Sequence, residues 1–164
     1  MRFLMKQKWL SWGDSFVIKD ELQRDVLYVQ GAVFSWGNQR SIREPDGLEV
    51  AEIKQVIFAW GPTYEVFRNG ALAAKVTKEI FTFFKCRFMI DVPGPDDLEA
   101  EGDFWDCEYT FSRRGQVVAQ ISKQWFSWTD TYGVDVAAGE DALLILASTV
   151  VIDCCCHDNR RNND

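Results

Sequence analysis

The sequence predicts a mainly β protein: a closed antiparallel barrel of about a dozen strands around one buried helix near the C-terminus. Three observations support this prediction. A tryptophan recurs at a fixed interval, many short segments have the composition of strands, and one long segment is apolar on every side. Of the 164 residues, 47% are hydrophobic and 26% are charged, which indicates one globular domain and excludes a disordered chain or a coiled coil.

The repeat indicates that one unit was reused along the chain. Trp12, Trp36 and Trp60 are 24 residues apart, and residues 58–66 have a second copy at 126–134. About two strands and their turns fit in 24 residues, so the unit is a β-hairpin unless the aromatic residues recur by chance. We expect these tryptophans, with Trp128, to cap the core at strand ends.

Short segments with alternating or β-branched residues predict the strands. Asn69-Gly70 and similar turns join neighbouring segments as antiparallel hairpins. About a dozen strands are too many for one open sheet, so we expect the sheet to close. The predicted strands are residues 2–8, 16–19, 26–29, 33–35, 39–43, 49–55, 64–68, 73–78, 85–91, 108–113, 117–122 and 131–136.

Residues 140–156 predict the helix. Two acids precede an apolar run from Ala142 to Ile152. A helix over residues 140–156 would measure about 25 Å. A helix that is apolar on every side needs apolar walls on every side, which a barrel interior provides. The alternative is a buried strand, which Val150, Val151 and Ile152 would also suit.

Several pieces of the chain resemble the LURP-one-related family of the tubby C-terminal-like superfamily. They are residues 5–8, 58–64, 81–88, 118–123 and 130–135, together with the apolar helix that follows. The resemblance implies a twelve-stranded barrel threaded by a central helix, here as one domain of residues 1–158 before a polar tail of residues 159–164. It also implies a binding module for a phosphoinositide, another lipid headgroup or a protein partner. Phospholipid scramblases belong to the same superfamily, so a calcium-regulated membrane-lipid effector is the alternative.

Charge and cysteine content limit the partners and the compartment. The net charge of -7 disfavours nucleic acid as a partner. Five cysteines, three of them consecutive, do not form a regular disulfide framework, and the first residues lack the apolar segment of a signal peptide. We therefore expect a cytoplasmic protein, with association at a membrane surface as a further possibility.

Few residues could carry catalysis. His157 is the single histidine, and the chain contains no nucleophile elbow, phosphate-binding loop or zinc-protease motif. We therefore expect a protein that is not an enzyme and has no cofactor or catalytic residues. The run Cys154 to Cys156 before His157 could suggest zinc or lipidation, but adjacent ligands do not wrap one ion easily. We expect these cysteines to pack at the end of the barrel, two inward and one outward.

Two charged groups are candidate sites. Residues 91–108 contain eight acids and no base. We expect a solvated loop, with calcium binding as the alternative through Asp96, Asp97, Glu99, Glu101 and Asp103, although their spacing does not match an EF-hand. Two basic pairs are the candidates for a lipid headgroup, because residues two apart on a strand share one face. These pairs are Lys6 with Lys8 and Lys85 with Arg87.

Overall fold

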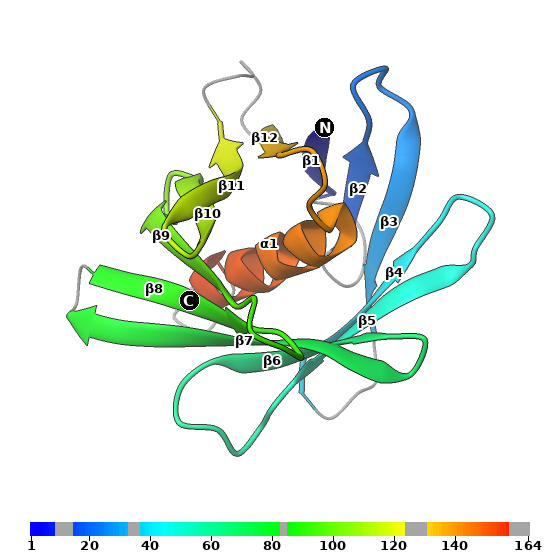
Figure 1. Ribbon diagram of the computed structural model, residues 1–164. Helices are drawn as coiled ribbons and strands as arrows, with labels where there is room; N and C mark the ends of the chain where they lie inside the picture. The colour runs from blue at the N-terminus through cyan, green and yellow to red at the C-terminus, as the bar shows by residue number, and fades with distance from the viewer. Residues whose placement is uncertain (9–14, 33–36, 83–84, 124–130, 158–164) are drawn as a thin grey trace.

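The computed structural model describes residues 1–8, 15–32, 37–82, 85–123 and 131–157. These residues form twelve strands and one helix (Figure 1). In chain order they are β1 (Arg2–Lys8), β2 (Ser15–Lys19), β3 (Asp25–Gly31), β4 (Gln39–Arg43), β5 (Glu49–Gln55), β6 (Thr63–Arg68), β7 (Ala71–Thr82), β8 (Lys85–Asp91), β9 (Leu98–Asp103), β10 (Glu108–Arg113), β11 (Gln116–Ser122), β12 (Thr131–Val136) and α1 (Ala142–His157).

The strands form a closed antiparallel barrel in which each strand pairs with its neighbours in sequence. The barrel closes where β1 meets β12, with Met5 opposite Tyr132 and Phe3 opposite Val134. Alternation along the strands puts apolar side chains inside: Tyr109 and Phe111 of β10 are buried, whereas Thr110 between them is half-buried on the outer face. The predicted fold class is confirmed.

Helix α1 lies inside the barrel (Figure 1). Ile145, Leu146, Val150 and Val151 are each at most 1% exposed, because barrel walls enclose the helix on every side. Asp141 caps its first turn, with Oδ1 accepting a hydrogen bond from the Leu144 N–H at 3.1 Å. Among the described residues, no helix has both the length and the apolar composition needed to span a membrane.

Two ion pairs fasten the start of the helix to the barrel. Arg68 at the end of β6 pairs with Asp141, and Arg113 at the end of β10 pairs with Glu140. The Arg113 and Glu140 side chains are 24% and 17% exposed, so water screens this pair only partly. The two acids before the helix therefore fix its position as well as complementing its dipole.

The prediction of a solvated loop over residues 91–108 is wrong, because strand β9 lies within it. Leu98 and Ala100 of β9 face the core and are fully buried, and Glu99 between them faces outward. Gly102, two residues further on, is exposed, and an added Cβ there would lie 2.5 Å from the Glu108 carbonyl oxygen of β10. The acids thus occupy the outer face of a strand and the two turns that flank it. The predicted strand at residues 33–35 lies outside the described residues.

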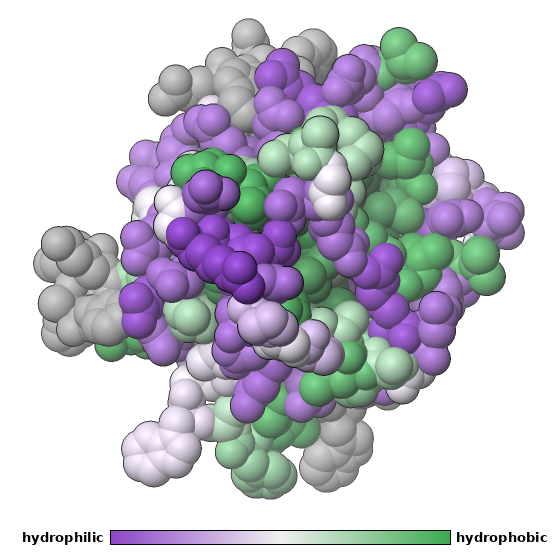
Figure 2. Space-filling model, viewed as in Figure 1, coloured by the Kyte–Doolittle hydropathy of each residue, from purple (hydrophilic) through white to green (hydrophobic). Residues whose placement is uncertain are grey.

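The predicted role of Trp60 as a cap on the core is also wrong. Its side chain is 102% exposed, and that of Phe58 is 98% exposed. Both lie on the connection between β5 and β6, where Gly61 has a φ of +89° and the chain projects beyond the sheet. Figure 2 shows pale and green side chains standing out at the lower edge of the molecule, where Figure 1 places this connection. Trp12, Trp36 and Trp128 lie outside the described residues.

Candidate functional site

The interior of the barrel is packed, so the candidate sites lie on its outer surface and at its two ends. The helix N-terminal end carries the β2–β3, β4–β5, β6–β7 and β10–β11 turns. The helix C-terminal end carries the β5–β6 and β9–β10 connections.

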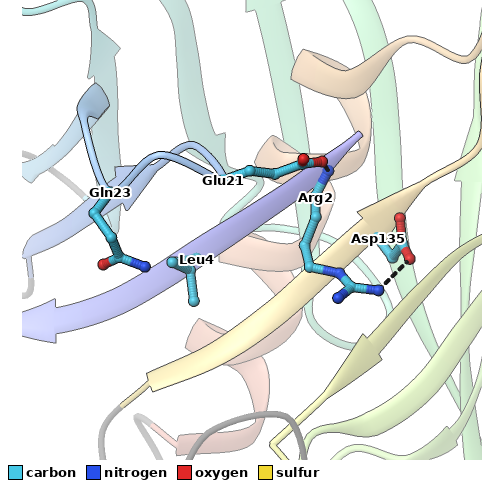
Figure 3. A pocket seen from close by; sticks show the side chains of 5 residues that line it. All are labelled: Arg2, Leu4, Glu21, Gln23 and Asp135. Carbon is cyan, nitrogen blue, oxygen red and sulfur yellow. Dashed lines mark hydrogen bonds and ion pairs between the residues drawn. The ribbon is translucent and has the colours of Figure 1, made fainter.

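A surface groove of about 490 Å³ lies at the helix N-terminal end (Figure 3). Its lining residues come from the start of β1, the β2–β3 turn and the end of β12. They are Arg2, Leu4, Glu21, Gln23 and Asp135. Leu4 is only 5% exposed and forms an apolar part of the lining, while the other four supply polar groups.

Charges in the groove favour a ligand with a cationic group. The Arg2 guanidinium donates a hydrogen bond to Asp135 at 3.0 Å, as Figure 3 shows, and the Arg2 backbone N–H donates to Glu21 at 2.9 Å. One guanidinium and two carboxylates therefore line the groove, and the guanidinium is already paired with Asp135. A phosphate would have to displace Asp135, whereas an ammonium or guanidinium group could add to the carboxylates.

The two basic pairs predicted from the sequence do not come together. Lys6 and Lys8 lie on β1, while Lys85 and Arg87 lie on β8, and four strands separate β1 from β8 by the shorter way around the barrel. Lys6 is exposed on the same face of β1 as Arg2. The side chains of Lys8 and Lys85 lie outside the described residues.

Carboxylates surround Arg87. Its Nε donates to Glu79 at 2.6 Å, and its Nη1 lies 3.9 Å from Glu99. The hydrogen bond to Glu79 raises the pKa of Arg87, and the charges of Glu79, Glu99 and Glu101 raise it further. A phosphate at Arg87 would have to compete with these carboxylates.

Hydrogen bonds within the chain engage three of the five calcium candidates. Asp96 accepts from Arg114 at 2.8 Å, and Asp97 accepts from the Val92 N–H at 2.9 Å. Asp103 accepts from the backbone N–H groups of the next turn, as an aspartate does when it stabilises a turn. Glu99 and Glu101 project from the outer face of β9. Within the described residues, no group of three or more His, Cys, Asp or Glu side chains is placed to hold a metal ion.

Cysteines gather at the helix C-terminal end. Cys154, Cys155 and Cys156 are all buried. The expectation that one of the three faces outward is therefore wrong. Burial raises the pKa of Cys107, in the β9–β10 turn, to about 11 and that of Cys156 to about 12. These thiols are protonated at neutral pH, and they pack as small apolar groups.

The second outer feature is the aromatic hairpin, which we define as residues 56–62 between β5 and β6. It presents Ile57, Phe58 and Trp60 to solvent, and Ile80 of β7 is also 64% exposed. Sequence reasoning found the Phe-Ala-Trp-Gly motif but assigned it to the core. The length of the connection was the available signal, because seven residues exceed a tight hairpin turn and can project from the sheet.

Comparisons with known proteins agree on one family and one fold. The sequence model of the LURP-one-related family matches residues 1–153. The uncharacterised protein YxjI of Bacillus subtilis (strain 168) is 31% identical over 147 residues, which cover 90% of this chain and 88% of that protein. A crystal structure of the Arabidopsis thaliana protein AT5G01750 superposes with a TM-score of 0.63 and 18% identity, covering 92% of this chain and 88% of that one.

Proposed function

The chain belongs to the LURP-one-related family, and from this premise we propose that it is a non-enzymatic binding module that acts through its outer surface. One observation carries the proposal: α1 fills the barrel, with Ile145, Leu146 and Val150 at most 1% exposed. A barrel that encloses a substrate needs an open interior, and here side chains occupy it. Binding then belongs to the groove and the turns.

The groove is the proposed ligand site. Its two carboxylates, Glu21 and Asp135, favour a partner that presents a basic group, such as a lysine or arginine side chain of another protein. A phosphoinositide headgroup is the second ligand class, and it would depend on Lys6, which is exposed two residues beyond Leu4 on β1. The paired state of Arg2 supports the basic partner over the phosphoinositide.

A vesicle sedimentation assay separates these ligand classes. The vesicles contain phosphatidylcholine with or without a phosphoinositide, each with and without calcium, and Lys6→Glu is the test variant. The proposal predicts no gain in binding from the phosphoinositide and no effect of calcium. A gain that Lys6→Glu abolishes would instead establish the headgroup site, and a gain that requires calcium would establish the scramblase-type alternative.

A peptide titration tests the basic partner directly. A lysine-rich and a glutamate-rich peptide of equal length are titrated into the parent protein and into Asp135→Asn, with binding followed by calorimetry. The proposal predicts that the lysine-rich peptide binds the parent more tightly, and that Asp135→Asn weakens this binding several-fold. Equal binding by both peptides, or no effect of Asp135→Asn, would contradict the assignment of the groove.

A further inference from the structure

Two neighbouring turns at the helix N-terminal end each present one exposed leucine. Leu22 in the β2–β3 turn is 70% exposed, and Leu48 in the β4–β5 turn is 60% exposed. The Leu22 N–H donates a hydrogen bond to Asp20 at 2.9 Å, and the Leu48 N–H donates one to Asp46 at 2.9 Å. An aspartate two residues earlier thus orders each turn, and both turns hold a leucine toward solvent.

The leucines continue the groove along one side of the barrel end. The strand order there is β12, β1, β2, β3, β4 and β5, and the groove extends from Asp135 of β12 to Glu21, beside Leu22. Neighbouring strands lie about 4.8 Å apart, so the two leucines lie about 10 Å apart and the whole surface measures about 20 Å. We call the groove residues together with Leu22 and Leu48 the extended groove. Figure 2 shows green side chains among purple ones toward the upper right and right edges, where Figure 1 places the two turns.

Negative charge dominates the connections at this end. Residues 20–24, 44–48, 69–70, 92–97, 114–115 and 137–141 together contain eight acids and two bases. Arginines pair with several of these acids, as Arg68 does with Asp141. Among the described residues, no ion pair involves Glu21, Glu44 or Asp46, which lie in the same two turns as the leucines. The exposed leucines are therefore bordered by carboxylates without a cationic partner.

We propose that the extended groove binds a basic amphipathic helix of a partner protein. The inference rests on the proposed function and deepens it, because it adds an apolar face to the basic group that the groove favours. Leucines seven residues apart on one face of a helix lie about 10 Å apart, which matches the spacing of Leu22 and Leu48. Lysines or arginines beside them would meet Glu21, Glu44 and Asp135, and about 14 residues of helix would span the surface.

A second copy of this chain is the competing occupant. It would bring its own acids against Glu21, Glu44 and Asp46, and like charges across an interface weaken binding. Exposed leucines alone do not choose between partners. The carboxylates do choose, because they favour an apolar surface that is bordered by positive charge.

Two peptides of the same composition test the apolar requirement. Both contain lysine, leucine and alanine, but the first has its leucines on one helical face and the second has them spread around the helix. Each is titrated into the parent protein, with binding followed by calorimetry. We expect the first peptide to bind about tenfold more tightly, because only its leucines can cover Leu22 and Leu48 together.

Variants assign this preference to the two leucines. The double variant Leu22→Ser, Leu48→Ser should bind both peptides equally, whereas Val117→Ser should keep the tenfold preference. Val117 is 62% exposed and lies at the same end of the barrel, but on β11, outside the extended groove. Thermal melting of the double variant should match that of the parent, because both leucines are exposed.

A second pair of variants tests the charge. The double variant Glu44→Gln, Asp46→Asn should bind the first peptide several-fold more weakly than the parent does. Asp106→Asn is the control, since Asp106 is exposed in the β9–β10 turn at the opposite end of the barrel. It should bind the peptide as the parent does.

Three results would overturn the proposal. They are equal affinity of the parent for both peptides, an equal loss in Val117→Ser and in the double leucine variant, and a dimer of the parent in gel filtration that the double leucine variant breaks. Equal affinities that still fall in Asp135→Asn would leave the groove proposal standing. A preference that depends on Leu22 and Leu48 but not on Asp135 would instead remove the groove and keep the two turns.

Discussion

Leu146→Ala is expected to destabilise the protein strongly, because the residue is only 1% exposed on a helix enclosed on every side. Replacing a buried leucine by alanine costs about 2–5 kcal/mol, and the cost rises with the cavity that remains. The barrel walls are hydrogen-bonded to one another and cannot close around a shortened side chain. We therefore expect about 3–5 kcal/mol, or about 6–20 °C in melting temperature for a chain of this length.

Urea unfolding followed by circular dichroism measures this loss, with the exposed Leu72→Ala as the control. The control should change the free energy of unfolding by less than about 0.5 kcal/mol. Leu146→Asp should prevent soluble folding, because a carboxylate would have no water inside the barrel. A soluble Leu146→Asp protein with a native spectrum, or a loss below about 1 kcal/mol in Leu146→Ala, would refute the packed interior.

Three further predictions concern strand β9, the connection that precedes it and the buried cysteines. Gly102→Ala should destabilise the protein far more than Gly47→Ala in the same urea assay. A Cβ at position 102 would lie 2.5 Å from a carbonyl oxygen, whereas a Cβ at position 47 would face open space. Equal losses in the two variants would contradict the register of β9. Asp97→Ala should lower the free energy of unfolding by about 1 kcal/mol, because the Val92 N–H loses its acceptor. Millimolar calcium should leave the melting temperature of the parent protein unchanged. The free energy of unfolding should fall as pH rises from about 9 to about 11, because Cys107 and Cys156 lose their protons in the unfolded state first; stability that is flat over this range would contradict their burial.

The barrel and its helix could be predicted because their residue patterns can be recognised in the sequence alone. A helix that is apolar on every side from Ala142 to Ile152 is stable only in apolar surroundings. Asn69-Gly70 specifies a tight turn wherever the strands lie. Strand β9 was missed because Glu99, Ala100 and Gly102 have low strand propensity. Its pairing with β8 and β10 overrides that propensity, and only the three-dimensional structure shows those neighbours.

The candidate sites could be predicted only in part. Spacing of two residues puts Lys6 and Lys8 on one face of a strand, but it does not give the distance around the barrel to Arg87. For Trp60, the sequence shows an aromatic residue at a strand end without showing whether the turn folds back or projects. The groove brings Arg2 and Asp135 together from opposite ends of the chain, because the barrel closes between β1 and β12.

The central claim is that α1 is a permanent part of the core, so that ligands bind the outer surface. Native-state hydrogen exchange of the backbone amides tests it most directly. The account predicts that the amides of residues 146–152 exchange only with global unfolding, as slowly as the best-protected amides of the strands. Exchange of these amides orders of magnitude faster than exchange in the strands would show that the helix leaves the barrel, and would contradict the claim.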